Sequence, residues 1–462
     1  MTHEPFDQLS HVLARHVVET RALPNRALLA TQASLTDAVA VSIAASSLTP
    51  AARPFLETAL EISHGSSVIV GYGERCSAPM AAWVNGALAH GIDYEDTHDS
   101  AIAHPHAAAI AAALAMIDYR PEPVSGTEFL TAIGLAGDLV CRIAASFDVS
   151  PDTFGWHVTP WLGVFGAATA AGKLLNLDAD QMIAAWSLSM SQMASFGELK
   201  YSPLSDVRSV RDAFAAKAGV LGVMLAARNV RGYERPLEGK AGFLNGVARN
   251  QYQPVRILDA LGEVFLGAEV SFKPWPACRG THAYIEAGVA ISRMAGFDPS
   301  QVDDIEVVIN QKNEMLCLPE ELKRAPENAI GAKFSIPFTV ATALVKGEVT
   351  IASFEPDALK DPRILSLAAR VRHRLDPGIP LRETTKGSVT VKAGGEVFSH
   401  SVDKALGHPE KPLGPVEFKA KFNDCVGYAA KPFGDQKREQ LWDCLNRVYQ
   451  LNDVREMTAL LA

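Results

Sequence analysis

Cysteine is scarce in this sequence and forms no pattern. Six cysteines are scattered over 462 residues, and no two of them are spaced as a CxxC motif. Such spacing indicates neither a disulfide framework nor an iron–sulfur cluster. We therefore expect a cytoplasmic protein whose thiols stay reduced.

Basic clusters and long apolar runs are also lacking. The net charge is −9 and no run of lysine and arginine offsets it, which argues against a nucleic-acid partner. No apolar run reads as long enough to span a membrane, and the first ten residues, MTHEPFDQLS, lack the basic-then-apolar pattern of a signal peptide. From these absences we expect that the protein binds neither nucleic acid nor a membrane. They leave room for a small anionic carboxylate substrate, because a few cations can converge in one pocket of an acidic protein.

The first part of the chain is dominated by helical patterns. From about residue 7 to about residue 260, alanine-rich segments show apolar spacings near 3.6 residues, which is typical of helices. Small residues on several faces indicate closely packed helices, and Gly163, Gly166 and Gly172 are expected at helix contacts.

The composition changes near residue 270. Alternating segments at 303–311 and 387–402 predict strands, and a helix between them is expected to end at Gly347. The sequence thus predicts a mainly α protein with an α+β second domain. We expect a large helical domain from residues 1–269 and 405–462, and an inserted α+β domain from residues 270–404.

The segment from His90 to His106 is dense in titratable groups. It holds four of the 13 histidines and four acidic residues, whereas 17 residues of average composition would hold about half a histidine. The alanine-rich runs on either side would otherwise be expected simply to bury themselves. Polar titratable groups of this density are where we expect chemistry.

Helix signals suggest how this segment is arranged. They predict a helix over residues 80–97, on which His90, Asp93 and Thr97 share one face at i, i+3 and i+7. After a loop, the next helix is expected to begin directly after His104, with this histidine at its N-terminus. The positive end of that helix dipole would disfavour an imidazolium and leave a neutral ring able to accept a proton. Such a site could do acid–base work near neutral pH.

Cations that could bind an anion occur in two other places. Lys273 and Arg279 lie in FKPWPACRGTH at the predicted domain junction, which is a favoured position for ligand pockets. Arg208 and Arg211 lie at i and i+3 in VRSVRDAF, where they could bind carboxylates from one face of a helix start. Surface salt bridges with the neighbouring aspartates are an equally good explanation of these two arginines.

Plainer interpretations of the histidine-rich segment stay open. His104, His106 and Asp93 could ligate a metal, although the sequence has no HExxH motif. The whole segment could also be structural, with buried and hydrogen-bonded histidines. Taken singly, Glu95, His98 and His106 are more typical of structural residues than of catalytic ones.

Several motifs together resemble the MmgE/PrpD family, which includes 2-methylcitrate dehydratase, cis-aconitate decarboxylase and iminodisuccinate epimerase. They occur in family order: VNGALAHGIDYEDTH followed by HP, VFGAATAAGKLLNLDADQ, PLEGKAGF, FKPWPACRGTHA, AKFSIPFTVATAL and GHPEKPLGPVEFKAKF. The resemblance spans about residue 40 to about residue 425. It implies a large helical domain made from both chain ends, an inserted α+β lid and a homodimer, with no metal and no organic cofactor.

The resemblance also implies roles for individual residues. By position, the family's active-site Asp, Thr and His fall on Asp93, Thr97 and His104, and its lid-hinge lysine falls on Lys273. Many members have a Lys-x-x-His pair where this chain has Arg208-Ser-Val-Arg211. Because arginine does not readily exchange protons, this pair should bind substrate rather than catalyse. The complete predicted substrate-binding set is Arg208, Arg211, His98 and Arg279.

The expected activity is that of a cofactor-independent lyase on a small di- or tricarboxylate. His104 would move a proton at the carbon alpha to a carboxylate, while Lys273 and Arg208 hold that carboxylate and Asp93 lies near the leaving hydroxyl. A hydro-lyase of the 2-methylcitrate dehydratase type is the first hypothesis. A cis-aconitate-type decarboxylase or an iminodisuccinate-type epimerase could use the same parts. A metal-dependent hydrolase and a non-catalytic helical scaffold are the remaining alternatives.

Overall fold

The computed structural model describes residues 8–202 and 204–462. Contacts divide the chain into a helical unit, which comprises the chain up to Val270 together with Lys419–Ala462, and an α+β unit, Ser271–Phe418. The second crossing between the units thus follows Phe418, where the sequence analysis expected it after residue 404. Residues 1–7, part of the N-terminal segment without a signal-peptide pattern, lie outside the described residues.

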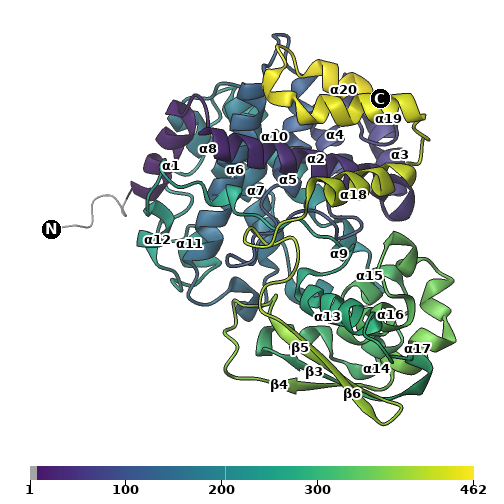
Figure 1. Ribbon diagram of the computed structural model, residues 1–462. Coiled ribbons are helices and arrows are strands. Elements are labelled where there is room, and N and C mark those ends of the chain that lie inside the picture. The colour runs from purple at the N-terminus through teal and green to yellow at the C-terminus, as the bar shows by residue number, and fades with distance from the viewer. Residues whose placement is uncertain (1–7, 203) are drawn as a thin grey trace. The chain divides into compact units, whose positions relative to one another are not determined.

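The helical unit is built from helices of both chain ends. Its regular elements are α1 (Leu9–Glu19), α2 (Asn25–Leu48), α3 (Ala52–Ile62), β1 (Ser67–Val68), β2 (Arg75–Cys76), α4 (Ala78–Ala89), α5 (Ala107–Ile117), α6 (Gly126–Ser146), α7 (Val158–Leu174), α8 (Ala179–Met190), α9 (Val207–Val210), α10 (Asp212–Ala226), α11 (Phe243–Gly246), α12 (Pro254–Leu258), α18 (Pro415–Gly427, whose first four residues belong to the other unit), α19 (Asp435–Asn446) and α20 (Arg455–Leu461). The C-terminal helices return to the N-terminal ones, since α19 packs on α2 and α20 on α5 (Figure 1).

Small residues let the central helices α4, α5, α7 and α10 approach one another closely. A Cβ added at Gly86 of α4 would lie 2.7 Å from the carbonyl oxygen of Asp212 at the start of α10. Gly163 of α7 faces the methyl groups of Ala108 in α5 and Ala215 in α10, as expected for a helix-contact glycine. This close packing matters for the site, because α4 ends and α7 and α10 begin beside it.

Two helices correct the expectation that no apolar run reaches membrane-spanning length. By length and composition alone, α2 and α6 are long and apolar enough to cross a membrane. Within the structure, however, 78% of the apolar window of α2 and 94% of that of α6 are buried. Core helices of soluble proteins show such burial, and the absence of a membrane partner stays a prediction.

The α+β unit contains a four-stranded sheet covered by helices. Its elements are α13 (His282–Ser292), β3 (Val302–Ile309), α14 (Glu320–Arg324), α15 (Ala329–Lys333), α16 (Ile336–Lys346), α17 (Pro362–Ala368), β4 (Val371–Leu375), β5 (Gly387–Ala393) and β6 (Glu396–Val402). The strand order is β4-β3-β5-β6. β3 pairs in parallel with β4, with Ile305 opposite Val371, whereas β5 pairs antiparallel with β3 and with β6.

The burial of these strands follows their sequence pattern. In β3 and β5, side chains alternate between buried and less buried positions, so that one face joins the core of the unit. Helices α13 and α16 pack on each other, α13 also contacts β5 and β6, and α16 contacts β4 (Figure 1). Gly347 ends α16 in the left-handed conformation at φ 72°, as predicted. The predicted fold class, mainly α with a second α+β part, is confirmed.

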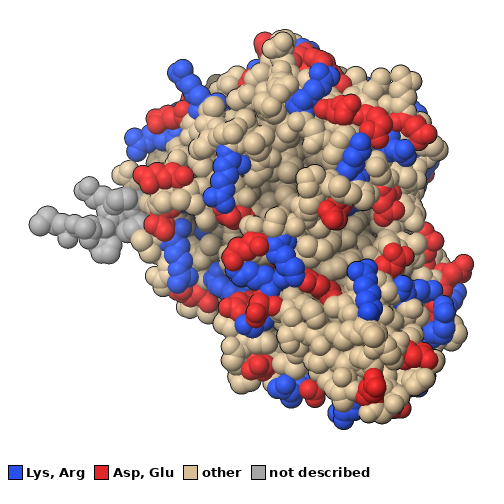
Figure 2. All heavy atoms as spheres, in the orientation of Figure 1, with Lys and Arg blue, Asp and Glu red and all other residues tan. Residues whose placement is uncertain are grey.

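The visible surface carries charges of both signs. On the face drawn in Figure 2, acidic and basic side chains are interspersed, and no broad basic area is seen among the residues described there. The expectation that no nucleic acid binds stays a prediction.

Candidate active site

The histidine-rich segment is a loop between two helices. The predicted helix over residues 80–97 is wrong in its second half, because α4 ends at Ala89 and His90 is its C-cap. Gly91 follows, and Asp93 has φ 53°, a left-handed conformation that cannot continue a right-handed helix. Short polar side chains that favour turns over helices therefore decide the local structure here.

The predicted helix terminus at His104 is also wrong. α5 begins at Ala107 and has His106 as its N-cap, so His104 lies ahead of the helix rather than at its first turn. The group beside His104 is a carboxylate: its Nδ1 lies 2.6 Å from Glu95 Oε1. The electrostatic partner that the structure gives His104 is therefore this carboxylate rather than the first turn of a helix.

Glu95 lies at the centre of a cluster of titratable side chains. His90 Nδ1 lies 2.5 Å from Glu95 Oε1, the same oxygen that His104 approaches, and 3.7 Å from Asp93 Oδ1. The two imidazole rings meet edge to face with their centroids 5.2 Å apart. The side chains of His90, Asp93 and Glu95 are at most 1% exposed, whereas that of His104 is 19% exposed. Of these four groups, His104 is thus the one open to a ligand.

A second carboxylate–histidine pair fixes the end of the loop. His106 Nδ1 lies 2.6 Å from Asp96 Oδ2, and both side chains are buried. The ring is packed against α6 at Gly137, where an added Cβ would come within 2.2 Å of Nε2. This pair is buried too deeply to meet a ligand, and it agrees with the structural reading of His106.

A buried arginine joins the cluster from the start of α10. Arg211 is 4% exposed, and its Nη2 lies 3.4 Å from His90 Nδ1. Its Nη1 donates to His157 Nε2 at 3.3 Å, which makes that nitrogen an acceptor and leaves the ring proton on Nδ1, towards Asp152. Lys200 Nζ completes this group at 2.9 Å from Asp152 Oδ1. A permanent positive charge is therefore held between two histidines.

The electrostatics of this group keep His157 neutral. Burial lowers the pKa of His157 to about 3, and the charges of Arg211 and Lys200 act in the same direction. Burial by itself would raise the pKa of Asp152, but its contacts with His157 and Lys200 outweigh it and hold that pKa below its usual range. The neutral ring of His157 can therefore accept a hydrogen bond from Arg211 and orient it without adding a second positive charge.

This arrangement predicts how stability depends on pH. Because the pKa of His157 falls from 6.5 in the unfolded chain to about 3 in the fold, its contribution is complete above pH 6.5 and is lost as the pH falls towards 3. His157→Gln should therefore reduce the loss of unfolding free energy between pH 6.5 and 4.5 by up to roughly 1.4 kcal/mol per pH unit. Urea titrations at several pH values measure it. The exposed His64→Gln serves as the control, and equal slopes in both variants would contradict the prediction.

The remaining predicted residues lie in three places. Thr97 and His98 are buried within the same loop; Thr97 Oγ1 lies 3.4 Å from Asp99 Oδ1, and His98 Nδ1 accepts the N–H of Ala101 at 3.1 Å. Burial lowers the pKa of His98, so its ring is neutral. Arg208 is half-buried in α9. The roles assigned to these three residues stay predictions.

Lys273 and Arg279 belong to the α+β unit, and both are buried. The guanidinium of Arg279 donates to the carbonyls of Leu406 at 2.7 Å and Ala405 at 3.2 Å. These contacts account for a buried arginine without a substrate, and they join the beginning of this unit to its end. The catalytic role of Lys273 and the binding role of Arg279 stay predictions.

The cluster could also be considered as a metal site. His90, Asp93, Glu95 and His104 each place one donor atom within 4.8 Å of the others. An ion held tetrahedrally at about 2.0–2.1 Å would separate its ligand atoms by about 3.3 Å. The distances from Glu95 Oε1 to the two Nδ1 atoms are 2.5 and 2.6 Å, which suit hydrogen bonds better than shared coordination. A metal would require these side chains to move apart.

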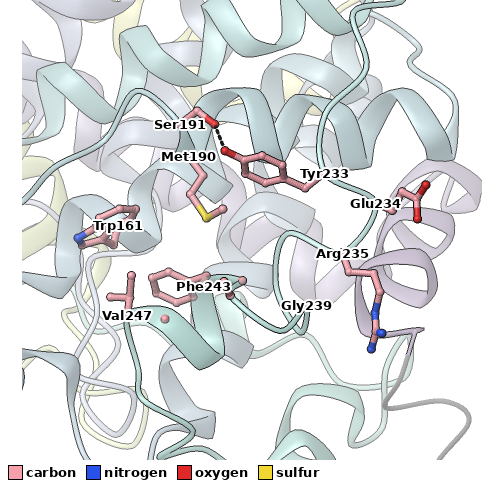
Figure 3. A pocket seen from close by; sticks show the side chains of 12 residues that line it. Trp161, Met190, Ser191, Tyr233, Glu234, Arg235, Gly239, Phe243 and Val247 are labelled. Carbon is pink, nitrogen blue, oxygen red and sulfur yellow. Dashed lines mark hydrogen bonds between the residues drawn. The ribbon is translucent and has the colours of Figure 1, made fainter.

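A separate pocket of about 650 Å³ lies elsewhere in the helical unit. Its wall is largely apolar, with Trp161, Met190 and Phe243, and the hydroxyl groups of Ser191 and Tyr233 are hydrogen-bonded at 2.8 Å (Figure 3). Glu234 and Arg235 also line the pocket, on the side away from Trp161 and Val247 (Figure 3). Because this lining is mostly apolar, the pocket is a weaker candidate for a polycarboxylate site than the cluster around Glu95.

The sequence reasoning did not identify two residues that this geometry brings forward. Glu95 was within the segment of interest, but its offsets of five and nine residues from His90 and His104 match no helical spacing. His157 lies 51 residues after His106, the last residue of that segment, and no local motif marks it. Only the packing of α7 and α10 shows that His157 meets Arg211.

Together these features define a mainly α protein of two units whose helical unit carries a carboxylate–histidine cluster beside a buried arginine. The chain matches the MmgE/PrpD N-terminal domain over residues 8–254 and the MmgE/PrpD C-terminal domain over residues 275–447. The chain therefore belongs to the MmgE/PrpD family, and the resemblance drawn from its motifs is confirmed.

Several characterised relatives are named as decarboxylases. The cis-aconitate decarboxylase-like protein oryM of Aspergillus oryzae is 28% identical over 322 residues, which cover 66% of each chain. The cis-aconitate decarboxylase of Mus musculus is 24% identical over 412 residues, and that of Homo sapiens is 25% identical over 414 residues. Both alignments cover 86% of this chain and 82% of the relative.

Proposed function

We propose that this chain is a lyase that acts on a small tricarboxylate by moving a proton at a carbon beside a carboxylate. One observation carries the proposal: His104, the partly exposed member of the cluster, is paired through Nδ1 with the buried carboxylate of Glu95. The family and the decarboxylase names of the relatives support a lyase. A di- or tricarboxylate substrate also agrees with the buried Arg211.

His104 is the proposed proton carrier. With Nδ1 directed at Glu95, the ring would exchange protons with a substrate through Nε2. The carboxylate holds the ring in one orientation and stabilises the imidazolium that forms when the ring accepts a proton. General acid–base catalysis by a histidine placed in this way contributes typically 10²–10⁴-fold.

Arg211 is the proposed anion-binding charge. It cannot be deprotonated near neutral pH, and its hydrogen bond to His157 Nε2 orients its guanidinium before a substrate arrives. A fixed positive charge in a dry site stabilises the enediolate-like charge that develops beside a carboxylate. Arg208, on the preceding helical turn, is the second candidate for this role.

Two reaction types share this proton step. In decarboxylation, the C–C bond to a carboxylate breaks, CO₂ leaves, and the electron pair left on carbon takes a proton from His104. In dehydration, His104 accepts the proton from carbon, the C–O bond breaks, and the hydroxyl leaves as water after it takes that proton from the His104 imidazolium. The names of the relatives make a cis-aconitate-type decarboxylation the first to test, ahead of the 2-methylcitrate-type dehydration favoured by sequence; epimerisation returns the proton to the other face.

Proton exchange measured by NMR tests the proposal. Chelator-treated protein is incubated in D₂O with cis-aconitate, 2-methylcitrate, citrate and iminodisuccinate in separate samples. We expect deuterium incorporation into one acid, together with release of CO₂ or a new olefinic signal, and loss of both in His104→Gln. If no acid exchanges and activity appears only after a divalent metal is added, the proposal is overturned in favour of the metal-dependent alternative.

The assembly and location are further proposals. The homodimer, the cytoplasmic location and the need for no cofactor derive from the family resemblance and from composition. Sedimentation analysis of the purified chain would measure the first of them.

A further inference from the structure

A buried lysine from the C-terminal part of the chain reaches the middle of the active-site loop. Lys421 of α18 donates through Nζ to the main-chain carbonyl of Tyr94 at 2.8 Å, and the ammonium lies 4.0 Å from the centroid of the Tyr94 ring. Asp37 of α2 is its counter-charge, with Oδ1 at 2.5 Å. The two side chains are 4% and 1% exposed. The mechanism proposed above uses neither of them.

The position of this contact is what makes it informative. Tyr94 lies between Asp93 and Glu95, the two carboxylates of the cluster. Asp93 is held at φ 53°, a conformation that costs a non-glycine residue of order 1 kcal/mol or more and persists only where its surroundings enforce it. The loop has no ladder of its own here, apart from the isolated bridge between His98 and Ala103. Local contacts, such as the Asp93 N–H bond to the His90 carbonyl and the two histidines on Glu95, hold part of this loop, and the Lys421 contact adds a support from outside it.

The charges around Lys421 indicate whether its ion pair with Asp37 serves stability or geometry. Burial raises the pKa of Asp37 to about 6, the ammonium of Lys421 opposes this rise, and the nearby Asp96 and Glu95 add to it. Burying such a pair costs desolvation energy that the attraction between the two charges only partly offsets. A fold gains little net stability from it, so a role in fixing one geometry is the better explanation.

We propose that Lys421 is a positioning residue of the active site: it holds the carbonyl of Tyr94 so that Asp93 and Glu95 stay in place beside His90 and His104. The effect on catalysis rests on the proposed function, whereas the effect on the loop does not. Asp37 serves to keep the ammonium buried at this place.

Hydrogen exchange of the loop amides tests the positioning role without any substrate. In the full chain carrying Lys421→Met, we expect the peptides that cover residues 90–104 to exchange about tenfold faster than in the parent. Lys173→Met is the matched control. Its half-buried ammonium also donates to a main-chain carbonyl, but that carbonyl belongs to Val18 of α1 and not to the loop. It should leave exchange in the loop unchanged.

A double variant separates positioning from stability. Lys421→Met with Asp37→Leu removes both charges, so no unpaired buried charge is left to destabilise the fold. We expect the melting temperature to recover while the loop still exchanges about tenfold faster, because the Tyr94 carbonyl still lacks its donor. Unchanged loop exchange in this double variant would overturn the proposal, as would an equal increase in Lys173→Met.

The catalytic consequence has its own readout. With an acid that the parent enzyme converts, the double variant should lower kcat about tenfold with little change in KM, and Lys421→Arg should restore part of kcat because it keeps a donor and a charge. A double variant with full kcat would overturn the positioning role. If the loop loosens as expected but the parent converts no acid, positioning stands and the proposed function fails.

Discussion

Replacing His104 by glutamine is expected to lower the rate of proton exchange with the substrate by about a thousandfold, within the 10²–10⁴ range of general acid–base catalysis. Glutamine keeps a side chain of similar size that can still contact Glu95 Oε1, but it cannot carry a proton between carbon and solvent. The 19% exposure of His104 means that little packing is lost. The melting temperature should therefore change by only a few degrees. Deuterium incorporation followed by NMR gives the rate, and thermal unfolding gives the stability.

The control for this prediction is another histidine of the helical unit. His64 is exposed and lies outside the cluster, so His64→Gln should exchange at the parental rate. A His104→Gln variant that retains the parental rate would contradict the assignment of the proton carrier. It would also favour the alternative of a helical scaffold whose apparent activity comes from a contaminant.

The clustering of titratable groups could be predicted from the sequence, but its geometry could not. The density of His and acidic residues between His90 and His106 identified the segment correctly as a cluster of titratable groups. The predicted helix failed in its second half because signals for the start of a helix do not show where it ends. A glycine followed by Asp93 in the left-handed region ended it eight residues early.

Contacts between distant segments explain the other differences. This chain has Arg208 and Arg211 where many members of the family have a Lys-x-x-His pair, so no histidine was expected at this place. In the structure, His157 contacts Arg211 from the start of α7. No sequence pattern relates positions 157 and 211, because the meeting depends on how α7 packs on α10. The same holds for Lys421, which comes to the loop from the far end of the chain.

In the α+β unit, the sequence analysis predicted the strands whose apolar and polar residues alternate clearly, and it missed the strand that lacks this alternation. The segments at 303–311 and 387–402 became β3, β5 and β6. β4, with the sequence VRHRL, was missed because three of its five residues are basic and only Val371 is buried. An edge strand of this kind is fixed by its parallel pairing with β3 rather than by an apolar face of its own.

Replacing Glu95 by glutamine is the second substitution expected to have a large effect. The shape is kept, but a neutral amide replaces the carboxylate oxygen that both His90 and His104 approach within 2.6 Å. The amide cannot stabilise an imidazolium as a carboxylate does, and where its NH₂ group takes the place of Oε1 it donates to an Nδ1 atom instead of accepting from it. We expect kcat to fall by about 10²–10⁴-fold, of the order seen when the carboxylate partner of a catalytic histidine is made neutral.

The protonation of the two rings distinguishes this explanation from simple loss of structure. Nitrogen-detected NMR of labelled histidine should show the parental rings protonated at Nδ1, and Glu95→Gln should shift one of them to the other tautomer. The exposed Glu57→Gln is the control, since Glu57 pairs with Arg53 on the surface of α3. Unchanged tautomers with a full loss of kcat would show that Glu95 acts directly on the substrate instead. Because Glu95 is 1% exposed and His104 is 19% exposed, we expect the histidine to be the group that meets the substrate and the carboxylate to act through it.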